Sequence, residues 1–284
     1  MQTSNDTIRS PDFQTIPGCG PQLDGGLTHS FAIPVGIGDL TAMATPGLAG
    51  ASRVAMFIPG FSGSKEDFLS FFPRLYAKLD DSADCALVSY SQRGQADSAA
   101  PTGQGAYRLA DFVADGCAVM ESLATGDHPI DLVGHSFGGL VARRMAIVRP
   151  DLVRSVTLFS TGAVPIGQSE ITRSAKELLQ RYGSMVVFKG NFPDCEDVPQ
   201  DDPYTEMCRL RAHATSLDNL LAVSDILIDY NDVTNALKDT KIPISIVYGA
   251  NDLVWPQAVY RAEAQRLGIS PTVIADAGHS GQLD

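Results

Sequence analysis

Short apolar runs alternate with longer segments of helical periodicity over residues 29–160. The apolar runs, which predict strands, are residues 29–35, 39–45, 53–59, 86–90, 131–134 and 154–160. The segments with apolar residues every three or four positions, which predict helices, are residues 65–79, 107–123 and 137–148. Short buried strands separated by helices are typical of a mostly parallel sheet covered on both faces. The pattern therefore predicts an α/β fold.

The alternation stops at about residue 161 and returns near residue 240, with a strand at 243–249, a helix near 256–267 and a strand at 271–275. The interrupted part is more polar and largely helical in pattern. We therefore predict a core made of residues 29–160 and 240–284, with a helical cap inserted at 161–239. Residues 1–28 mix Pro, Gly, Asn and Asp without periodicity, which predicts an irregular lead-in.

Composition narrows the classes of function. Of the 284 residues, 44% are hydrophobic and 19% are charged, so a substantial core can form. The net charge of −12 gives no basic face for nucleic acid and disfavours anionic membranes. No apolar run approaches the roughly 20 residues of a membrane span. The polar N-terminus lacks the features of a signal peptide, so we expect a cytoplasmic protein that acts on a small molecule.

Two further features leave alternatives open. The five cysteines show no CxxC spacing, which indicates neither a disulfide framework nor a zinc site. Cys195 and Cys208 could pair if they met in space, but free thiols are favoured. Residues 191–206 contain six acidic side chains and no basic one. This loop either is simply solvated or repels anionic substrates.

The segment Gly134-His135-Ser136-Phe137-Gly138 joins a predicted strand to a predicted helix. It fits the G-x-S-x-G pattern, in which a serine stands on a sharp, strained turn. A side chain in place of Gly134 or Gly138 would clash with the neighbouring strand and helix. Amide groups at the helix N-terminus favour developing negative charge. Ser136 is therefore the candidate nucleophile.

A serine nucleophile needs a histidine base, and two histidines follow Ser136 in the chain. His279 stands just after the last predicted strand, in Asp-Ala-Gly-His-Ser, where a loop can reach Ser136. His213 lies inside the predicted cap and is better read as a lid or surface residue. His135 is next to the serine but should point elsewhere and pack. We therefore favour His279.

The base in turn needs a carboxylate to orient it. Asp252 follows the strand at 243–249, at the carboxyl edge where catalytic groups of open α/β sheets gather. Asp276 is the runner-up, although it is only three residues from His279. Asp225 and Asp229 lie in the insertion and are better read as solvated. Asp252 is the favoured acid.

An acyl-transfer site also needs two donors for the oxyanion. One is the backbone N–H of Phe137, the residue after the serine. The other is expected in the turn after residues 53–59, where Gly60 permits the required backbone and Phe61 supplies the N–H. The side chains of Phe61 and Phe137, with Leu220, Leu221 and Leu227, suggest an apolar substrate group. These leucines could instead pack the cap onto the sheet.

By these motifs the chain resembles the α/β-hydrolase superfamily, in particular its lidded esterase-type members, often from actinobacteria. The resemblance covers about residues 29–280 and rests on IPGFSGSKEDF, SYSQRGQADS, LVGHSFGGL, VYGANDLVWP and DAGHS in that order. It implies an α/β-hydrolase fold, Ser136 as nucleophile, Asp252 as acid, His279 as base, and Phe61 and Phe137 as oxyanion donors. It also implies that residues 161–239 form the family's helical cap.

Two departures from the family pattern matter. Many relatives have His-Gly where this chain has Pro59-Gly60, so a side chain is missing from that turn while the backbone donor remains. Relatives usually add a C-terminal helix, whereas this chain stops five residues after His279. The missing helix would expose apolar surface near the last strand, so we expect either that the chain is cut short or that another element or a second subunit, as in a homodimer, covers this surface.

The predicted function is hydrolysis of a small-molecule carboxylic ester through an acyl-enzyme, with no metal and no organic cofactor. The same residues could cleave a thioester, a lactone, an amide or a C–C bond, or perform perhydrolysis. A non-catalytic small-molecule binder is the alternative from another class. A Ser136→Ala change would separate the two classes, because binding could survive it and turnover could not.

Overall fold

The computed structural model describes residues 23–79, 84–124 and 128–283. Most of the expected lead-in at 1–28, and Cys19 with it, lies outside these residues. Eight strands form one sheet in the order β1-β2-β4-β3-β5-β6-β7-β8. The strands are β1 (His29–Val35), β2 (Gly38–Ala44), β3 (Arg53–Ile58), β4 (Cys85–Tyr90), β5 (Ile130–His135), β6 (Val153–Phe159), β7 (Ile244–Gly249) and β8 (Thr272–Ile274).

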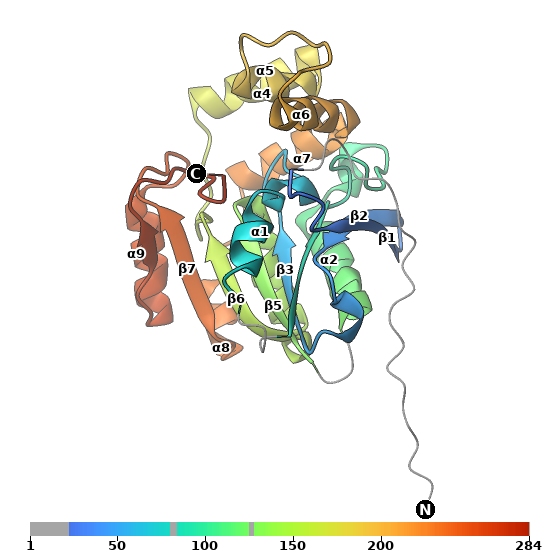
Figure 1. The fold of residues 1–284 in the computed structure, drawn as a ribbon. Coiled ribbons are helices and arrows are strands. Elements are labelled where there is room, and N and C mark those ends of the chain that lie inside the picture. Colours follow the sequence, from blue (N-terminus) through green and yellow to red (C-terminus); the bar gives the residue numbers. More distant parts are fainter. Residues whose placement is uncertain (1–22, 80–83, 125–127, 284) are drawn as a thin grey trace, which may run out of the picture.

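The sheet is mostly parallel, which confirms the predicted fold class. β2 pairs antiparallel with β1 and with β4, and every other neighbouring pair of strands is parallel. Parallel strands place their carboxyl ends at one edge of a sheet. The segments that follow β3, β5, β7 and β8 therefore meet at the same edge, which is the upper edge in Figure 1.

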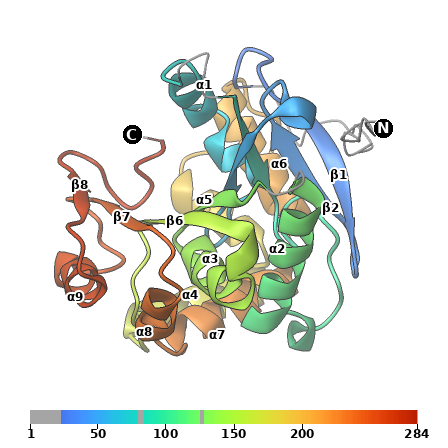
Figure 2. The same cartoon turned by 90° about the horizontal axis from the view of Figure 1, so that it is seen from below.

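Helices cover both faces of the sheet. Figure 2 shows α1 on one side and α2, α3, α8 and α9 on the other. These helices are α1 (Phe71–Tyr76), α2 (Leu109–Leu123), α3 (Phe137–Val148), α8 (Thr234–Asp239) and α9 (Gln257–Leu267). Because side chains alternate along a strand, Met56 and Phe57 enter different apolar clusters. The larger cluster includes residues of α2, α3 and α9, and the smaller one gathers around Phe68 and Phe72.

The predicted single helix over residues 65–79 is wrong in detail. A 3₁₀ turn covers Lys65–Phe68, and α1 begins only at Phe71. Pro73 occupies the third position of α1, where a backbone N–H needs no partner within the helix. A helix running through from Lys65 would lose one of its hydrogen bonds at that proline. The apolar spacing nevertheless identified buried positions, because Phe68 and Phe72 are both buried.

Five helices stand between β6 and β7. Four of them lie beyond the carboxyl edge of the sheet in Figure 1. They are α4 (Glu170–Tyr182), α5 (Met185–Asn191), α6 (Pro203–Ala214) and α7 (Leu217–Ile228). α4 packs on α7, and α5 packs on α6. The fifth, α8, falls in the range 161–239 as well but packs on α3 and α9.

Three further observations concern the cysteines, membrane-spanning helices and the exposure of the last strand. Cys85, Cys117, Cys195 and Cys208 are free thiols, so Cys195 and Cys208 are not paired. In the ranges that the structure covers, no helix is both long and apolar enough to cross a lipid bilayer. Val273 and Ile274 in β8 are 43% and 38% exposed.

Candidate active site

Ser136 stands on a strained turn between β5 and α3. Its φ of 53° lies in the left-handed region that non-glycine residues rarely adopt. A Cβ at Gly138 would lie 2.2 Å from the Ile58 carbonyl oxygen, and one at Gly134 would lie 2.6 Å from the Gly138 oxygen. The predicted steric need for both glycines is therefore confirmed. The turn lifts the Ser136 side chain toward the segments beyond the sheet edge.

His279 reaches Ser136 from the loop after β8. Its Nε2 lies 2.9 Å from the Ser136 Oγ, although 143 positions separate the two residues in the chain. The loop is held close to the end of β7. Asn251 N–H donates to the Ala277 carbonyl at 2.9 Å, and a Cβ at Gly249 would lie 2.1 Å from the Gly278 oxygen.

Asp252 contacts the His279 ring on its Nδ1 side. Its two oxygens lie 3.1 and 3.0 Å from His279 Nδ1, and its side chain is fully buried. The Tyr260 hydroxyl donates to it at 2.5 Å and the Val254 N–H at 2.8 Å. Burial alone would raise the pKa of Asp252, but the hydrogen bond and charge of His279, with the Tyr260 and Val254 donors, hold that pKa below its usual value.

The buried carboxylate has a consequence for the tautomer of His279. An ionised Asp252 accepts a hydrogen bond from the Nδ1–H group, which leaves Nε2 free to accept a hydrogen bond from the Ser136 hydroxyl. The three side chains therefore form one hydrogen-bonded chain from Ser136 to Asp252. Sequence reasoning did not find Tyr260 or Val254. Their only signal was proximity in the chain to Asp252, with Tyr260 in the first turn of α9, the helix that follows.

The other candidates for the base and the acid lie outside the chain of hydrogen bonds from Ser136 to Asp252. His213 is on α6 with a half-exposed side chain, and its Nε2 lies 2.7 Å from Asp197. Asp276 is exposed, and Asp225 on α7 pairs with Lys176. Residues 191–206, expected as one acidic loop, begin at the end of α5 and end inside α6, whose Arg209 partly neutralises them. Arg209 pairs with Asp197 at 3.2 Å as well as with Glu206 at 2.8 Å.

His135 does more than the packing that we expected. It is buried, and its Nε2–H donates to the backbone carbonyl of His279 at 2.9 Å. The two imidazole rings are 5.1 Å apart. Burial, with the nearby His279, lowers the pKa of His135 to about 4, so the ring is neutral at physiological pH. His135 thus links the end of β5 to the loop that carries His279.

The turn after β3 lies directly against Ser136. A Cβ at Gly60 would be 3.0 Å from the Ser136 Cβ and 3.1 Å from His135 Nδ1, so glycine is needed for this close approach. Within the described residues, neither the Phe61 N–H nor the Phe137 N–H has a hydrogen-bond acceptor. Two free backbone donors therefore stand in the two segments that flank the serine.

A cavity of about 440 Å³ opens between the sheet edge and the inserted helices, with Ser136 and His279 in its wall. Phe61 and Leu227, two of the side chains expected to face a substrate, line it. The same expectation for the Phe137 side chain is wrong. Its ring is fully buried against Phe112, because the first turn of α3 points it into the core. Leu220 and Leu221 are also buried, in a cluster with Leu179.

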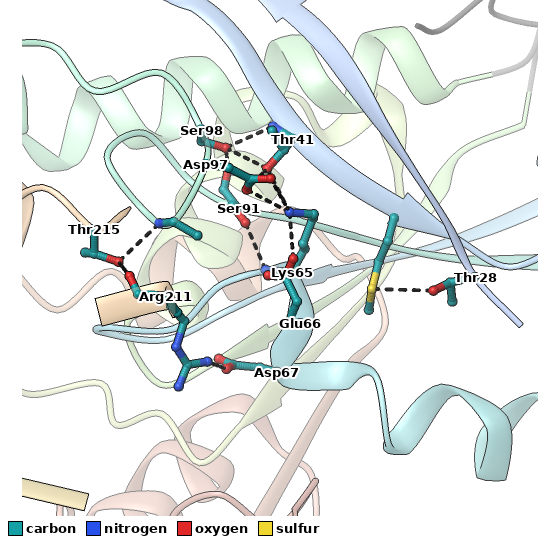
Figure 3. A network of polar contacts seen from close by, with 12 residues as sticks. Thr28, Thr41, Lys65, Glu66, Asp67, Ser91, Asp97, Ser98, Arg211 and Thr215 are labelled. Atoms are coloured by element: carbon teal, nitrogen blue, oxygen red, sulfur yellow. Dashed lines mark hydrogen bonds and ion pairs between the residues drawn. The ribbon is translucent and has the colours of Figure 1, made fainter. Parts of the chain in front are cut away.

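The cavity is lined by both apolar and polar residues. The apolar ones include Ile166, Ala175, Leu227, Ile228, Val254, Trp255 and Leu283. The polar ones include an ion pair between Asp67, from the 3₁₀ turn after β3, and Arg211 of α6 (Figure 3). Burial raises the pKa of Asp67, and the Arg211 charge opposes that rise. Among the described residues, no cluster of three or more His, Cys, Asp or Glu side chains could hold a metal ion.

Comparison with known proteins places the chain in a family. Residues 55–284 match the model of the alpha/beta hydrolase family, so the chain belongs to that family. It is 27% identical over 261 residues to a dihydrolipoyllysine-residue acetyltransferase component of an acetoin cleaving system from Cupriavidus necator, covering 83% of this chain and 61% of that protein. It is 34% identical over 115 residues to a triacylglycerol lipase of Pseudarthrobacter phenanthrenivorans, covering 40% of this chain and 30% of the lipase.

The chain thus spans about three fifths of the first relative and under a third of the second. Among solved structures, a thermophilic esterase from Thermogutta terrifontis superposes with a TM-score of 0.65 at 22% identity, covering 88% of this chain and 91% of that one. At this identity the likeness concerns the fold.

Proposed function

We propose that the protein is a serine hydrolase that cleaves a small-molecule carboxylic ester through an acyl-enzyme. One observation carries the proposal, namely the hydrogen-bonded chain from Ser136 through His279 to Asp252 in the wall of a cavity. A serine hydroxyl is a weak nucleophile, and a histidine that a buried carboxylate orients is the arrangement that activates it.

In the first half-reaction, His279 takes the Ser136 proton as Oγ attacks the ester carbonyl carbon. The carbonyl oxygen becomes an anion that accepts hydrogen bonds from the Phe61 and Phe137 N–H groups. When the tetrahedral intermediate collapses, the C–O bond to the alcohol breaks and His279 protonates the leaving oxygen. Water, deprotonated by His279, then attacks the acyl-enzyme. The acid is released and Ser136 regains its proton.

The charges in the site favour this sequence. Asp252 is ionised and buried, so it stabilises the imidazolium that forms on His279 in each transition state. The neutral His135 beside it adds no competing positive charge. Apolar residues of the cavity lining, among them Trp255 and Leu227, suit the hydrocarbon part of an ester.

Release of p-nitrophenol from its acetate, butyrate and octanoate esters tests the proposal. Ser136→Ala removes the nucleophile, so we expect kcat to fall by about 10⁴-fold or more. The matched control is Ser280→Ala, which changes another serine of the cavity wall and should leave kcat within about threefold. The order of the three esters would give the acyl length that the cavity accepts.

Other outcomes would point to other activities. If the folded wild type cleaves no ester but hydrolyses a lactone, a thioester or a diketone, and this activity is lost in Ser136→Ala, the mechanism stands with another substrate class. If the protein binds small molecules equally well with and without the Ser136 hydroxyl and turns none over, it is a binder, and the proposed function is wrong.

A further inference from the structure

Two buried glutamines hold the backbone of the turn that faces Ser136. Both come from the loop after β4, residues 91–98, which we call the 91–98 loop. Gln92 Nε2 donates to the Pro59 carbonyl at 2.9 Å, and Gln95 Nε2 donates to the Gly60 carbonyl at 2.8 Å. Each side chain is about 1% exposed. Long polar side chains are seldom buried this fully unless their hydrogen bonds are needed.

The orientation of the Gln95 amide follows from its partners. Its Oε1 accepts from the Gln92 backbone N–H at 2.9 Å, and only the oxygen of an amide can accept. The NH₂ group must therefore face the Gly60 carbonyl, which can only accept. The Gly63 N–H makes a second, longer hydrogen bond of 3.2 Å to the same Gly60 oxygen.

The Gly60 carbonyl and the Phe61 N–H belong to one peptide unit. In a trans peptide the C=O and N–H bonds are coplanar and point in opposite directions. Fixing the carbonyl toward the buried Gln95 therefore fixes the Phe61 N–H on the other side. This peptide begins at Gly60, whose Cα is so close to Ser136 that a Cβ would lie 3.0 Å from the serine Cβ.

We propose that Gln95 is a positioning residue that aims the Phe61 N–H at the oxyanion. It touches neither the substrate nor the reacting atoms, and it acts through the Gly60–Phe61 peptide. This role rests on the proposed acyl-transfer chemistry. A pre-oriented donor stabilises the transition state more than a mobile one, because no reorganisation is needed when the negative charge forms.

The 91–98 loop is anchored firmly enough for this task. Arg93 forms a buried ion pair with Asp115, with N–O distances of 2.6 and 2.8 Å. At the other end of the loop, the buried Lys65 amine donates to both oxygens of Asp97, at 2.7 and 3.0 Å (Figure 3). A loop held by charge-assisted hydrogen bonds on both sides of Gln95 gives its amide a fixed base.

The same loop also touches the inserted helices. The Ala96 N–H donates to Thr215 Oγ1 at 3.2 Å, and Ser216 N–H donates to the Gly94 carbonyl at 2.9 Å. Asn219 Nδ2 donates to the Arg93 carbonyl at 2.7 Å. The 91–98 loop thus lies between the start of α7 and the turn beside Ser136, and packing from both sides limits its movement.

The test compares Gln95→Met with Gln92→Met. The two glutamines have the same side chain, are equally buried and lie in the same loop. Gln92, however, holds the Pro59 carbonyl, and the peptide unit of that carbonyl carries the Gly60 N–H and not the Phe61 N–H. We expect Gln95→Met to lower kcat about 10- to 100-fold with KM nearly unchanged, because only the transition state carries the oxyanion. Gln92→Met should lower kcat by less than about threefold. Thermal unfolding of both variants checks that they are folded.

A second readout follows the oxyanion itself. A trifluoromethyl ketone that carries the acyl chain of the best ester adds reversibly to Ser136 and places a negative oxygen beside the two donors. Its inhibition constant should rise in Gln95→Met by the same factor by which kcat/KM falls. If Gln95→Met is unfolded, Gln95→Glu replaces it. At about pH 9 an ionised carboxylate keeps the acceptor for the Gln92 N–H but lacks the donor for Gly60.

The outcomes separate this role from the proposed function. Equal losses in the two folded methionine variants, or a loss of kcat without a matching rise in the inhibition constant, would overturn the role of Gln95 alone. A folded wild type that neither cleaves an ester nor binds the ketone would overturn the proposed function, and the role of Gln95 with it.

Discussion

The wall of the cavity that comes from the sheet edge and the wall that comes from the inserted helices hold their residues in different ways. In the sheet-edge wall, backbone segments nearly touch. A Cβ at Gly60, Gly138 or Gly249 would lie within 3.0 Å of a neighbouring segment. Ser136 is held at a strained φ, and His279 is tied to β5 through its own carbonyl. The position of each group is set by its immediate backbone neighbours.

The other wall is looser and more exposed where α4 forms it. Ala175 and Thr172 line the cavity from α4, and among the α4 residues whose side chains are described only Leu179 is buried. A Cβ at Gly190 of α5 would meet nothing within 4 Å. Such a surface tolerates changes of shape that the sheet-edge wall does not. The residues around Ser136 and the residues of α4 are thus held by separate structural means, and we propose that the first group carries the reaction while the second selects the substrate.

The largest expected effect comes from the buried end of the hydrogen-bonded chain. Asp252→Asn keeps the size of the side chain but removes the charge that fixes the His279 tautomer, so kcat for the best ester should fall by about 10³- to 10⁴-fold. The exposed runner-up, Asp276→Asn, serves as the matched control and should stay close to wild type. Equal losses in the two variants would contradict the assignment of Asp252.

The steric contrast between the walls can be tested with one added methyl group. Gly138→Ala places a Cβ 2.2 Å from the Ile58 oxygen and 2.6 Å from the Pro59 oxygen, so strands and helix must move apart. We expect the free energy of unfolding to fall by about 3 kcal/mol or more. Gly190→Ala, at an exposed position of α5 next to the looser wall, should leave it unchanged or raise it by up to about 1 kcal/mol. Urea unfolding of both variants would measure the difference. Similar changes in the free energy of unfolding of the two variants would contradict the steric difference between the two walls.

The neutral His135 predicts a pH dependence of stability for the sheet-edge wall. Its pKa is about 4 in the folded state against 6.5 ordinarily, so between these values the unfolded chain binds a proton that the folded chain excludes. As the pH falls from about 6.5 to about 4, this group should therefore remove up to about 3 kcal/mol from the free energy of unfolding. It should cause no further loss below that range.

His135→Gln should abolish that part of the slope when urea unfolding is measured across the same pH range. His213→Gln on α6 is the control, and it should retain the slope because His135 is still present. A His135→Gln variant whose stability falls with pH as steeply as that of the wild type would show that the imidazole is not held neutral by burial.

The smallest effect is expected in the looser wall. Ala175→Phe narrows the cavity from α4 and should raise KM for the octanoate ester by about three- to tenfold. The acetate ester, measured with the same variant, is the internal control and should be affected little. Equal changes for the two esters would mean that Ala175 acts on the reacting groups, and the separation of the two walls would not hold.

Much of the sheet-edge wall could be predicted because its requirements are local. Ser136 needs glycines on both sides and a strand and helix around it, and all of these stand within a few positions. Asp252 and His279 each follow a strand, and parallel strands bring their carboxyl ends together. The strand and helix pattern therefore placed these residues at one edge. It failed over residues 65–79, where Pro73 delayed the start of the helix.

The remaining features depend on contacts between distant segments. His135 on the His279 carbonyl and Gln95 on the Gly60 carbonyl join residues that are 144 and 35 positions apart, and no spacing in the chain encodes these hydrogen bonds. Tyr260 is only eight positions from Asp252, but its hydroxyl reaches the carboxylate only because α9 packs beside β7. The direction of the Phe137 ring and the shape of the cavity likewise follow from how helices pack. The sequence by itself determined the α/β sheet and the residues that meet at its edge, because periodicity and strained turns are local properties. Only the tertiary structure decided what orients those residues and what surrounds them, because side chains acquire these partners only when the chain folds.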